Sequence, residues 1–444
     1  MSDIIGPKAL IPFTIGEGGE GGEPREEQFV RPYGLPTNPF TYIARDLLTW
    51  EALDTLPYQG VSFGRALDQQ GGWKGSLPLA KMFDATTGTY LFDWKDATRP
   101  SRTALFVDLE GTLVWGGILW KPSYDSEDPT HSLQVSATEL GSYFQHRLQA
   151  EDYGTIWEAG EDPMKVARRI IEDAQGKESE AGQPGYLSGS KIPVVLNPAA
   201  GSGQKVIVSY PGSSLQTVDS IISTLTQMGY GTGFDISYDV AYIPGTKVPA
   251  ITINLWWPLK GRNAAETGIV VLGMDTVKWT YPEDGEQQGT EVTETGGTGT
   301  TPEVAEPEKP LPGYPLMQKV IAHSQITTSQ QLDEIAIGDL ALYLYPTVTP
   351  SIVLPVGLPA SERSTLRLGE FDVGDRMIFR VDPVTPNGFG VAGENTSPRF
   401  PEGMEHEWRI NSWTCTPRDT GLSTVQLDLG VAPLRATNSP PPPH

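Results

Sequence analysis

The stretch that decides the fold is RTALFVDLEGTLVWGGILW, residues 102–120. It contains two runs of β-prone residues, 103–109 and 112–120, separated by Glu110-Gly111. A tight two-residue turn needs positive φ angles at its centre, and an acidic or amide residue followed by Gly is well suited to supply them. The stretch therefore predicts a β-hairpin.

The same residues also permit an enzymatic interpretation. The run Asp108-Leu109-Glu110-Gly111-Thr112-Leu113 resembles the nucleophile motif of haloacid-dehalogenase-type phosphatases. In such an enzyme Asp108 would attack phosphorus, and an acid two residues later would protonate the leaving group. The family has Asp at that second position, whereas this chain has Glu110, and a second strand follows where the phosphatase fold would start a helix. The hairpin is the preferred interpretation, and a phosphate-ester hydrolase using Asp108 is the alternative.

Composition favours a protein of short strands and many turns. The 444 residues include 49 Gly and 39 Pro, and a hydrophobic content of 38% allows two to four domains a core each. The single cysteine, Cys415, excludes an intrachain disulfide and a cysteine-based zinc site, and its alternating surroundings predict a buried side chain. No stretch approaches the roughly 20 apolar residues of a membrane span, and we expect no export signal.

The formal net charge of −23 argues against binding to a phosphate backbone, which would need clustered Lys and Arg. Two Gly-rich segments carry about half of this excess. Residues 17–27 have five Glu and one Arg, and residues 283–308 have eight acids and no Lys or Arg. The folded parts are therefore expected to be only mildly acidic.

The first half of the chain predicts a small β-barrel followed by helices. Residues 1–35 indicate an extended N-terminal arm, and residues 36–130 form a first β-barrel domain from strands at 42–49, 56–63, 73–79 and the hairpin. Residues 131–232 form an α+β insertion with helices at 136–148, 162–176 and 215–228. Ser136 and Glu139 make a capping box, and Asp162-Pro163 provides an N-cap with Pro at the first helical position.

The second half predicts further strands around one helix. Residues 233–282 contain strands at 234–243, 250–258 and 268–281, which complete the first barrel or an α+β domain. Residues 283–312 lack apolar periodicity and predict an acidic flexible insert. Residues 313–432 predict a second β-barrel domain, with a leading helix capped by Thr328 and Gln331 and strands at 352–356, 365–368, 376–381, 408–416 and 423–429. Residues 433–444 are expected to be a disordered tail.

These assignments define the expected fold class. It is α+β and β-rich, with two small β-barrel domains and an α+β region of three helices plus strands between them.

A second motif invites a nucleotide-binding interpretation. Residues 194–203, VVLNPAAGSG, resemble the first nucleotide-binding loop of lipid and diacylglycerol kinases, where amides of a Gly-rich turn cradle phosphate. That family has a later Gly-Gly-Asp-Gly-Thr loop, whereas the nearest candidate here, residues 229–233, has no acid between its glycines. A plain strand-to-strand turn is the preferred interpretation.

The other chemically capable side chains form no local set. The histidines are His131, His146, His323, His406 and His444, and no two of them lie within four residues, so no local zinc pair is possible. Eleven tryptophans could stack on sugars, but Trp256 and Trp257 point to opposite faces of one strand, and core or interface packing is preferred. The sequence thus predicts no catalytic residue, no cofactor site and no metal ligand.

Several motifs taken in order carry a family resemblance. Residues 42–49, 60–63, 75–79, 114–120 and 137–148 resemble the minor tail proteins of long-tailed bacteriophages (siphoviruses), especially those infecting actinobacteria. Relatives in that group belong to the baseplate hub, or N-terminal tail-associated-lysin, family. The helix at 332–344 and residues 368–376 and 409–416 resemble the second barrel of that family.

The resemblance implies a structural virion protein and not an enzyme. It implies a homotrimeric baseplate hub at the tail tip, made in the host cytoplasm, whose paired barrels continue the sixfold tail tube as a threefold pseudo-hexamer. The implied partners are other copies of the chain, the distal tail protein and tail tube, the tape measure protein, and a tip fibre or spike protein. DNA would pass through the channel on ejection without specific binding.

Two features depart from the family pattern. The arm at 1–35 and the acidic insert look like additions, and no lysin domain is expected because the chain stops near Pro433. A carbohydrate-binding module for host recognition stays open as a third interpretation.

Overall fold

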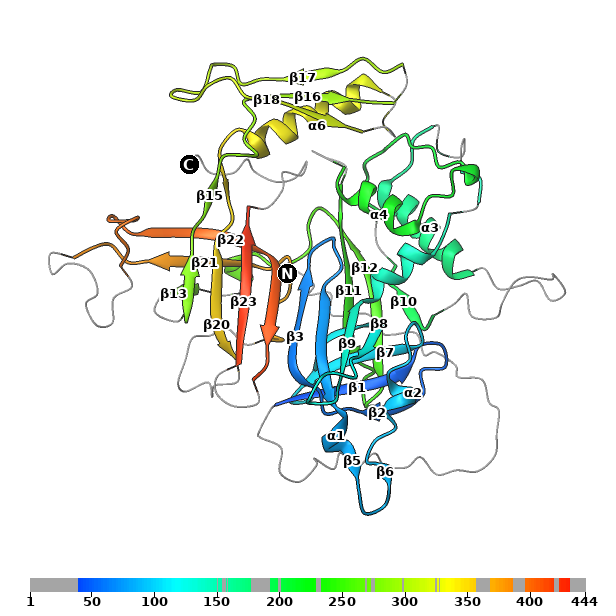
Figure 1. Cartoon of the computed structure of the whole chain (residues 1–444). Coiled ribbons are helices and arrows are strands. Elements are labelled where there is room, and N and C mark those ends of the chain that lie inside the picture. Colours follow the sequence, from blue (N-terminus) through cyan, green and yellow to red (C-terminus); the bar gives the residue numbers. More distant parts are fainter. Residues whose placement is uncertain are drawn as a thin grey trace, which may run out of the picture. The chain divides into compact units, whose positions relative to one another are not determined.

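The computed structural model (Figure 1) describes residues 39–431 except 150, 154–156, 158, 177–191, 199–200, 229–232, 268–269, 273–275, 298, 324–325, 327, 357–367, 386–395 and 419–422. The described residues all belong to one compact unit that begins at Thr37. The predicted arm at 1–35 and tail at 433–444 lie outside the described residues.

The first half of this unit is dominated by strands. They are β1 (Phe40–Asp46), β2 (Ala52–Thr55), β3 (Gln59–Ala66), β4 (Gly72–Pro78), β5 (Phe83–Asp84), β6 (Thr89–Tyr90), β7 (Thr103–Leu109), β8 (Thr112–Tyr124), β9 (Ser132–Glu139) and β10 (Val194–Leu196). The helices are α1 (Leu79–Met82), α2 (Trp94–Ala97), η1 (Leu140–His146), α3 (Pro163–Gly176), η2 (Gly212–Ser214) and α4 (Val218–Thr226).

Short strands also dominate the second half. They are β11 (Asp235–Tyr242), β12 (Pro249–Trp256), β13 (Val270–Leu272), β14 (Lys278–Thr280), β15 (Glu283–Asp284), β16 (Glu291–Thr295), β17 (Glu303–Ala305), β18 (Gln318–Ala322), β19 (Thr347–Val348), β20 (Ser351–Val356), β21 (Arg376–Val381), β22 (Met404–Thr416) and β23 (Ser423–Gly430). The helices are α5 (Ala264–Thr267) and α6 (Ser329–Tyr343).

The predicted hairpin is confirmed. β7 and β8 pair antiparallel with Leu109 opposite Thr112, so Glu110 and Gly111 are the two turn residues. Their φ angles are 51° and 93°, the positive values that such a turn requires. The Asp108 carboxylate accepts a hydrogen bond of 2.8 Å from the Gly111 amide, which closes the turn.

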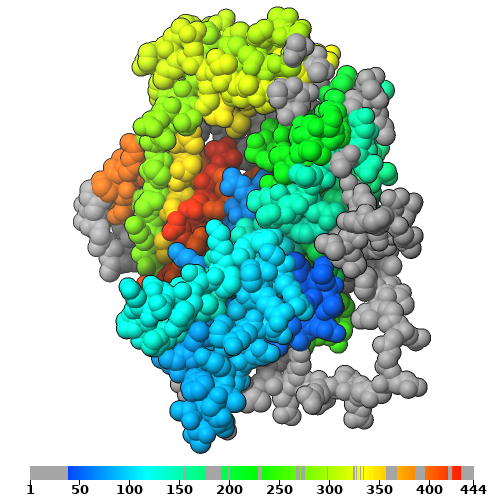
Figure 2. Space-filling view, turned by 45° about the vertical axis from the view of Figure 1, so that its right-hand side comes forward, coloured from blue at the N-terminus to red at the C-terminus, as the bar shows by residue number. Residues whose placement is uncertain are grey.

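One large sheet joins the two halves of the chain. Its strand order is β14-β20-β23-β22-β3-β4-β9-β8-β7-β1-β2, and β21 pairs with β22 and β13 beside this path. The joint is the antiparallel pairing of β22 with β3, in which Trp413 lies opposite Arg65 and Thr414 opposite Gly64. Figure 2 shows these segments, distant in sequence, side by side on one face, as blue and red surface.

The β-rich α+β class is confirmed, but the two predicted barrels need a correction. The strand pairing of the described residues follows one open path, and no closed barrel is found in it. The reason is β22, whose 13 residues are long enough to pair with β21 through one end and with β23 and β3 through the other. The two halves are therefore parts of one sheet.

The sheet is buried on both faces around β7. Leu105 and Val107 belong to one hydrophobic cluster, while Ala104 and Phe106, which alternate with them, belong to another. Alternating side chains of a strand point to opposite faces, so β7 lies between two cores. The first cluster contains apolar residues from both halves of the sheet, and the second includes residues of α3, α4, β11 and β12.

Three of the four helices predicted from the sequence are confirmed. α3, α4 and α6 lie where helices are predicted, and the side chain of Asp162 accepts the Met164 amide at 2.9 Å as an N-cap. The predicted helix at 136–148 is wrong, because residues 132–139 form β9, which pairs with β4 and β8 on its two sides, and a 3₁₀ helix follows. None of the described helices combines the length and apolarity needed to cross a membrane.

The insert at 283–312 was expected to be flexible, and this is wrong for its central part. β16 pairs with β17 antiparallel and with β18 in parallel, and α6 packs against β16 and β17. Figure 1 shows α6 lying along this small sheet. We call residues 286–343 the small module. The sequence did not predict its strands because the apolar alternation is weak: along β16 only Val292 and Glu294 point inward, and one of them is charged.

We predict that Gly64→Ala weakens the joint between the halves. A Cβ at Gly64 would lie 2.2 Å from the backbone oxygen of Trp413, so β3 or β22 must shift. The free energy of unfolding should fall by about 2–3 kcal/mol, as for overpacked cores, measured by urea denaturation. Gly72→Ala in the neighbouring strand is the matched control, because nothing lies within 4 Å of its Cβ. Equal stability of the two variants would contradict the close approach.

Candidate functional site

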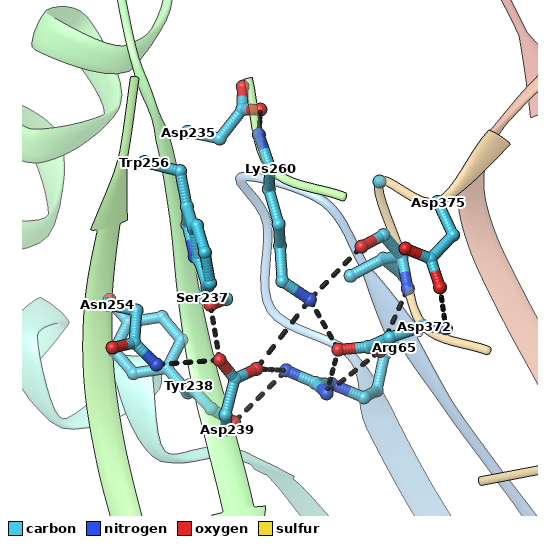
Figure 3. A network of polar contacts seen from close by, with 12 residues as sticks. Arg65, Asp235, Ser237, Tyr238, Asp239, Asn254, Trp256, Lys260, Asp372 and Asp375 are labelled. Atoms are coloured by element: carbon cyan, nitrogen blue, oxygen red, sulfur yellow. Dashed lines mark hydrogen bonds and ion pairs between the residues drawn. The ribbon is translucent and has the colours of Figure 1, made fainter. Parts of the chain in front are cut away.

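The site is a buried network of charged side chains where the two halves of the sheet meet. We call it the junction network and define it by Arg65 in β3, Glu139 at the end of β9, Asp239 in β11, Lys260 after β12 and Asp372 before β21. Figure 3 shows Lys260 and Arg65 lying between Asp239 and Asp372. Residues from both sheet halves and from the β11–β12 layer thus converge on one point.

Arg65 is the centre of the network. Its side chain is 8% exposed, and its guanidinium donates to Glu139 Oε1 at 3.0 Å, to Asp239 Oδ1 at 3.0 Å and to Asp372 Oδ2 at 2.8 Å. The Nη2 group also donates to the Tyr238 carbonyl at 3.1 Å. The planar fork of a guanidinium is suited to several carboxylates at once, so one side chain fixes three segments.

Lys260 is a second cation in the same place. Its side chain is 6% exposed, its Nζ contacts Asp372, and it lies 3.7 Å from Asp239 Oδ1. The Nζ also donates to the Val373 carbonyl at 3.1 Å. Asp239 accepts further hydrogen bonds from Ser237 Oγ at 2.9 Å and Asn254 Nδ2 at 2.7 Å, which anchor its carboxylate to β11 and β12 (Figure 3).

A fully buried ion pair extends the network to β22. Arg409 in β22 contacts Asp235 at the start of β11, and their side chains are 2% and 0% exposed. Arg409 also donates to the backbone oxygen of Lys260 at 3.1 Å and to that of Gly374 at 3.3 Å. The pair therefore connects the C-terminal half of the sheet to the same loop that carries Lys260.

Two glycines, Gly261 and Gly374, allow the loops of the network to come into contact. Gly261 has a φ of +100°, and a Cβ there would lie 2.1 Å from the Gly374 carbonyl oxygen. Arg262, next in the chain, donates to Asp375 Oδ2 at 2.6 Å and through its backbone amide to Asp375 Oδ1 at 2.9 Å. A side chain at Gly261 would separate these loops, so glycine is required there.

Charge in the network is unbalanced, with three carboxylates against two cations. Burial and the nearby Asp372 raise the pKa of Glu139 to about 7, despite the favourable contacts of its carboxylate with Arg65 and the Gly71 amide. Burial would also raise the pKa of Asp239, but Lys260 and Arg65 hold it below its ordinary value. Burial would lower the pKa of Arg65, and the three carboxylates raise it above its ordinary range.

The arrangement is suited to holding segments together. Each of the five charged groups of the network contacts a group of opposite charge. Burying such charges is favourable only when they are paired and hydrogen-bonded, and removal of one partner leaves an uncompensated charge. The network therefore penalises any motion that separates the halves.

Asp108, the nucleophile of the phosphatase interpretation, is held by hydrogen bonds within the chain. It is 8% exposed, and its two carboxylate oxygens accept from the Gly111 amide and from the Tyr242 hydroxyl at 2.7 Å. Glu110 lies in the turn itself. This geometry ties the hairpin to β11.

The motif at residues 194–203, which resembles a nucleotide-binding loop, is described only in part. Val194–Leu196 forms β10, while residues 199–200 and most of the second loop, 229–232, lie outside the described residues. The Gly203 amide donates to Asp162 Oδ2 at 2.8 Å. The Gly203 amide is thus already bound by a carboxylate of the chain itself.

The remaining side chains singled out in the sequence lie apart from the network. Trp256 is 36% exposed and donates to Ser237 Oγ, whereas Trp257 packs against the second hydrophobic cluster. Cys415 is buried as predicted, and burial raises the pKa of its thiol. Among the described histidines, His323 lies within 3.0 Å of Glu294, a contact that the sequence did not predict.

Sequence reasoning missed every member of the junction network except Glu139, which it assigned to a helix cap. Arg65 lies two residues beyond the strand predicted at 56–63, and the pairing of β3 with β22 decides which acids surround it. One local signal was present: a charged residue inside an apolar strand pattern, as at Arg65 and Arg409, indicates a buried partner.

Comparisons with known proteins show the fold. No protein-family profile matches the sequence, and no curated protein matches it. The tail protein from Neisseria meningitidis MC58 superposes with a TM-score of 0.50 at 9% identity, over 88% of this chain and 96% of that one. The prophage MuSo2 43 kDa tail protein from Shewanella oneidensis gives a TM-score of 0.51 at 11% identity, over the same shares. The chain shares the fold of these tail proteins.

We predict that Arg65→Met strongly destabilises the protein. It leaves Glu139 buried without its main cation, and the free energy of unfolding should fall by about 3–5 kcal/mol, measured by urea denaturation. Arg99→Met is the control, because Arg99 pairs with Asp96 on the surface, where a bridge contributes at most about 1 kcal/mol. Adding Glu139→Gln to Arg65→Met should restore part of the loss. A loss no larger than that of the control would refute the role of Arg65.

We predict a pH dependence from Glu139. Its pKa is raised from 4.5 to about 7 in the folded protein, so between these values only the folded state keeps the proton. This contribution to stability is complete below about pH 4.5 and is lost as the pH rises through about 7. Glu139→Gln should therefore show a smaller fall in the free energy of unfolding between pH 5 and pH 8 than the unsubstituted protein. Identical slopes would show that Glu139 is ionised throughout.

Proposed function

We propose that this chain is a structural component of a phage-type tail, acting as a homotrimeric baseplate hub at the tail tip. The observation that carries the proposal is the shared fold, which extends over 88% of the chain and includes two proteins named as tail proteins. An agreement of this extent covers both halves of the sheet and not one common motif. The proposal therefore concerns the whole described unit.

The junction network suits this role physically. In a hub of three chains, each chain would contribute two wall segments, so that three chains present six to the sixfold tube. Such a wall needs the two segments of a chain to keep a fixed relative position. Arg65, Lys260 and Arg409 provide this by binding acids from different segments in a buried setting.

The sheet also offers surfaces for neighbouring chains. In the described part of the chain, β2 and β14 are the two ends of the strand path, and an unpaired strand edge is a template for joining another strand. In a closed ring of identical chains, each such edge can pair with the corresponding surface of the next chain. We infer that contacts between copies use these ends of the sheet.

The remaining partners follow from the location. A hub would contact the distal tail protein and tail tube on one side and a tip fibre or spike on the other, with the tape measure protein reaching it through the tube. The net charge of −23 suits a channel through which DNA passes without being held. The virion tail tip is the location that we propose.

The assembly state tests the proposal directly. Light scattering coupled to size exclusion should give three times the 48.2 kDa chain mass at concentrations where assembly is favoured, and negative-stain images should show threefold rings. A compact monomer at all concentrations, also in the presence of the neighbouring tail proteins, would refute the trimeric hub.

The phosphatase alternative is tested by one substitution. We predict that the unsubstituted protein and Asp108→Asn release phosphate from a generic aryl phosphate at the same background rate, because the Asp108 carboxylate is held by Gly111 and Tyr242. An activity well above background that Asp108→Asn abolishes would replace the hub with an enzyme.

A further inference from the structure

Three metal-ligating side chains meet in the small module. Glu294 comes from β16, His323 directly follows β18, and Asp339 lies in α6. One ligand atom of each lies within 4.8 Å of the others. His323 Nε2 lies 3.0 Å from Glu294 Oε2. The cluster is formed by three elements that are separate in sequence.

Glu294 is the unusual member. Its side chain is 0% exposed, and neither carboxylate oxygen has a backbone or hydroxyl donor among the described residues. Among the described residues, His323 and Asp339 each place a ligand atom beside it. A buried carboxylate without a fixed donor is costly, so the site favours a bound positive charge.

Lys319 does not neutralise the cluster. It faces Asp339, but its Nζ lies over the Tyr343 ring at 3.8 Å and donates to Gln287. Two ionised carboxylates and a neutral imidazole would together carry two negative charges.

We propose that Glu294, His323 and Asp339 bind one divalent transition-metal ion of the zinc type. Two carboxylate oxygens and one imidazole nitrogen are a ligand set that zinc accepts, with water completing the tetrahedron. Calcium and magnesium prefer sites made of oxygen alone, so the imidazole selects against them. The ligand atoms are close enough that a small contraction of side chains would bring them to bonding distance.

The ion would hold the small module together. Its described residues bury few apolar side chains, namely Val292, Ala305, Ile326, Leu332, Ile335 and Ala336, and three of these, Ile326, Leu332 and Ile335, belong to the second hydrophobic cluster. A structural metal is one way to stabilise a region with so little apolar burial of its own. The proposed ion would join β16, the end of β18 and α6, and its binding energy would add to folding energy. This inference does not depend on the hub proposal.

Zinc binding by the full chain tests the site. The protein is freed of metal with a chelator and titrated with zinc chloride by calorimetry, with thermal unfolding as a second readout. We expect one zinc per chain and a higher unfolding temperature. His323→Gln and Asp339→Asn should each weaken binding by at least about 100-fold, the upper range for loss of even an indirect partner. Asp333→Asn, exposed on the same helix, and His406→Gln in β22 are controls that should bind as the unsubstituted protein does.

A spectroscopic measurement keeps the test decisive if the variants fail to fold. Cobalt(II) bound to the unsubstituted protein should give the intense visible absorption of a tetrahedral site, displaced by one equivalent of zinc. Binding should weaken as the pH falls, because protons compete for the ligands. Absence of stoichiometric zinc binding and of this absorption would overturn the proposal and leave a proton-sharing cluster. Unchanged affinity in both ligand variants would overturn it as well.

Discussion

The structure depends on a buried guanidinium that must be neutralised. Arg65 is 8% exposed, and it finds its carboxylates only when β3, β9, β11 and the loop before β21 occupy their observed positions. Because an unpaired buried charge costs several kcal/mol, about 3–5 for a broken pair, the network disfavours arrangements in which the two halves of the sheet are apart. Hydrophobic burial provides most of the stability, and the charges specify which surfaces meet.

This constraint explains how one sheet serves two halves. The β3–β22 pairing is short, from Phe63 to Ala66 on one strand and from Ser412 to Cys415 on the other. A ladder of this length alone would allow hinge motion. The junction network lies beside it on one side, and the first hydrophobic cluster contains residues of both halves. Rigidity at the joint is the property that the proposed role as a wall segment requires.

The sequence predicted what local chemistry determines. The Glu110-Gly111 turn, the N-cap of α3 and the strands around β7 follow from turn angles, capping and alternation within a few residues. Glu139 is a residue for which local chemistry predicted the wrong element. Its spacing from Ser136 fits a helix cap, but β9 pairs with strands on both sides and the Glu139 carboxylate binds Arg65. The junction network and the cluster around Glu294 escaped prediction because their members come from distant segments, and only the fold decides their distances.

Hydrogen exchange at the joint tests the central claim most directly. Peptide-resolved exchange would compare amides of β3 and β22 with those of the β7–β8 hairpin, whose β7 strand is buried on both faces. If the buried charges fix the two halves, the joint should show the same protection as the hairpin and lose it only in global unfolding. Fast exchange of β3 and β22 while the hairpin stays protected would show that the halves move independently, and would contradict this account.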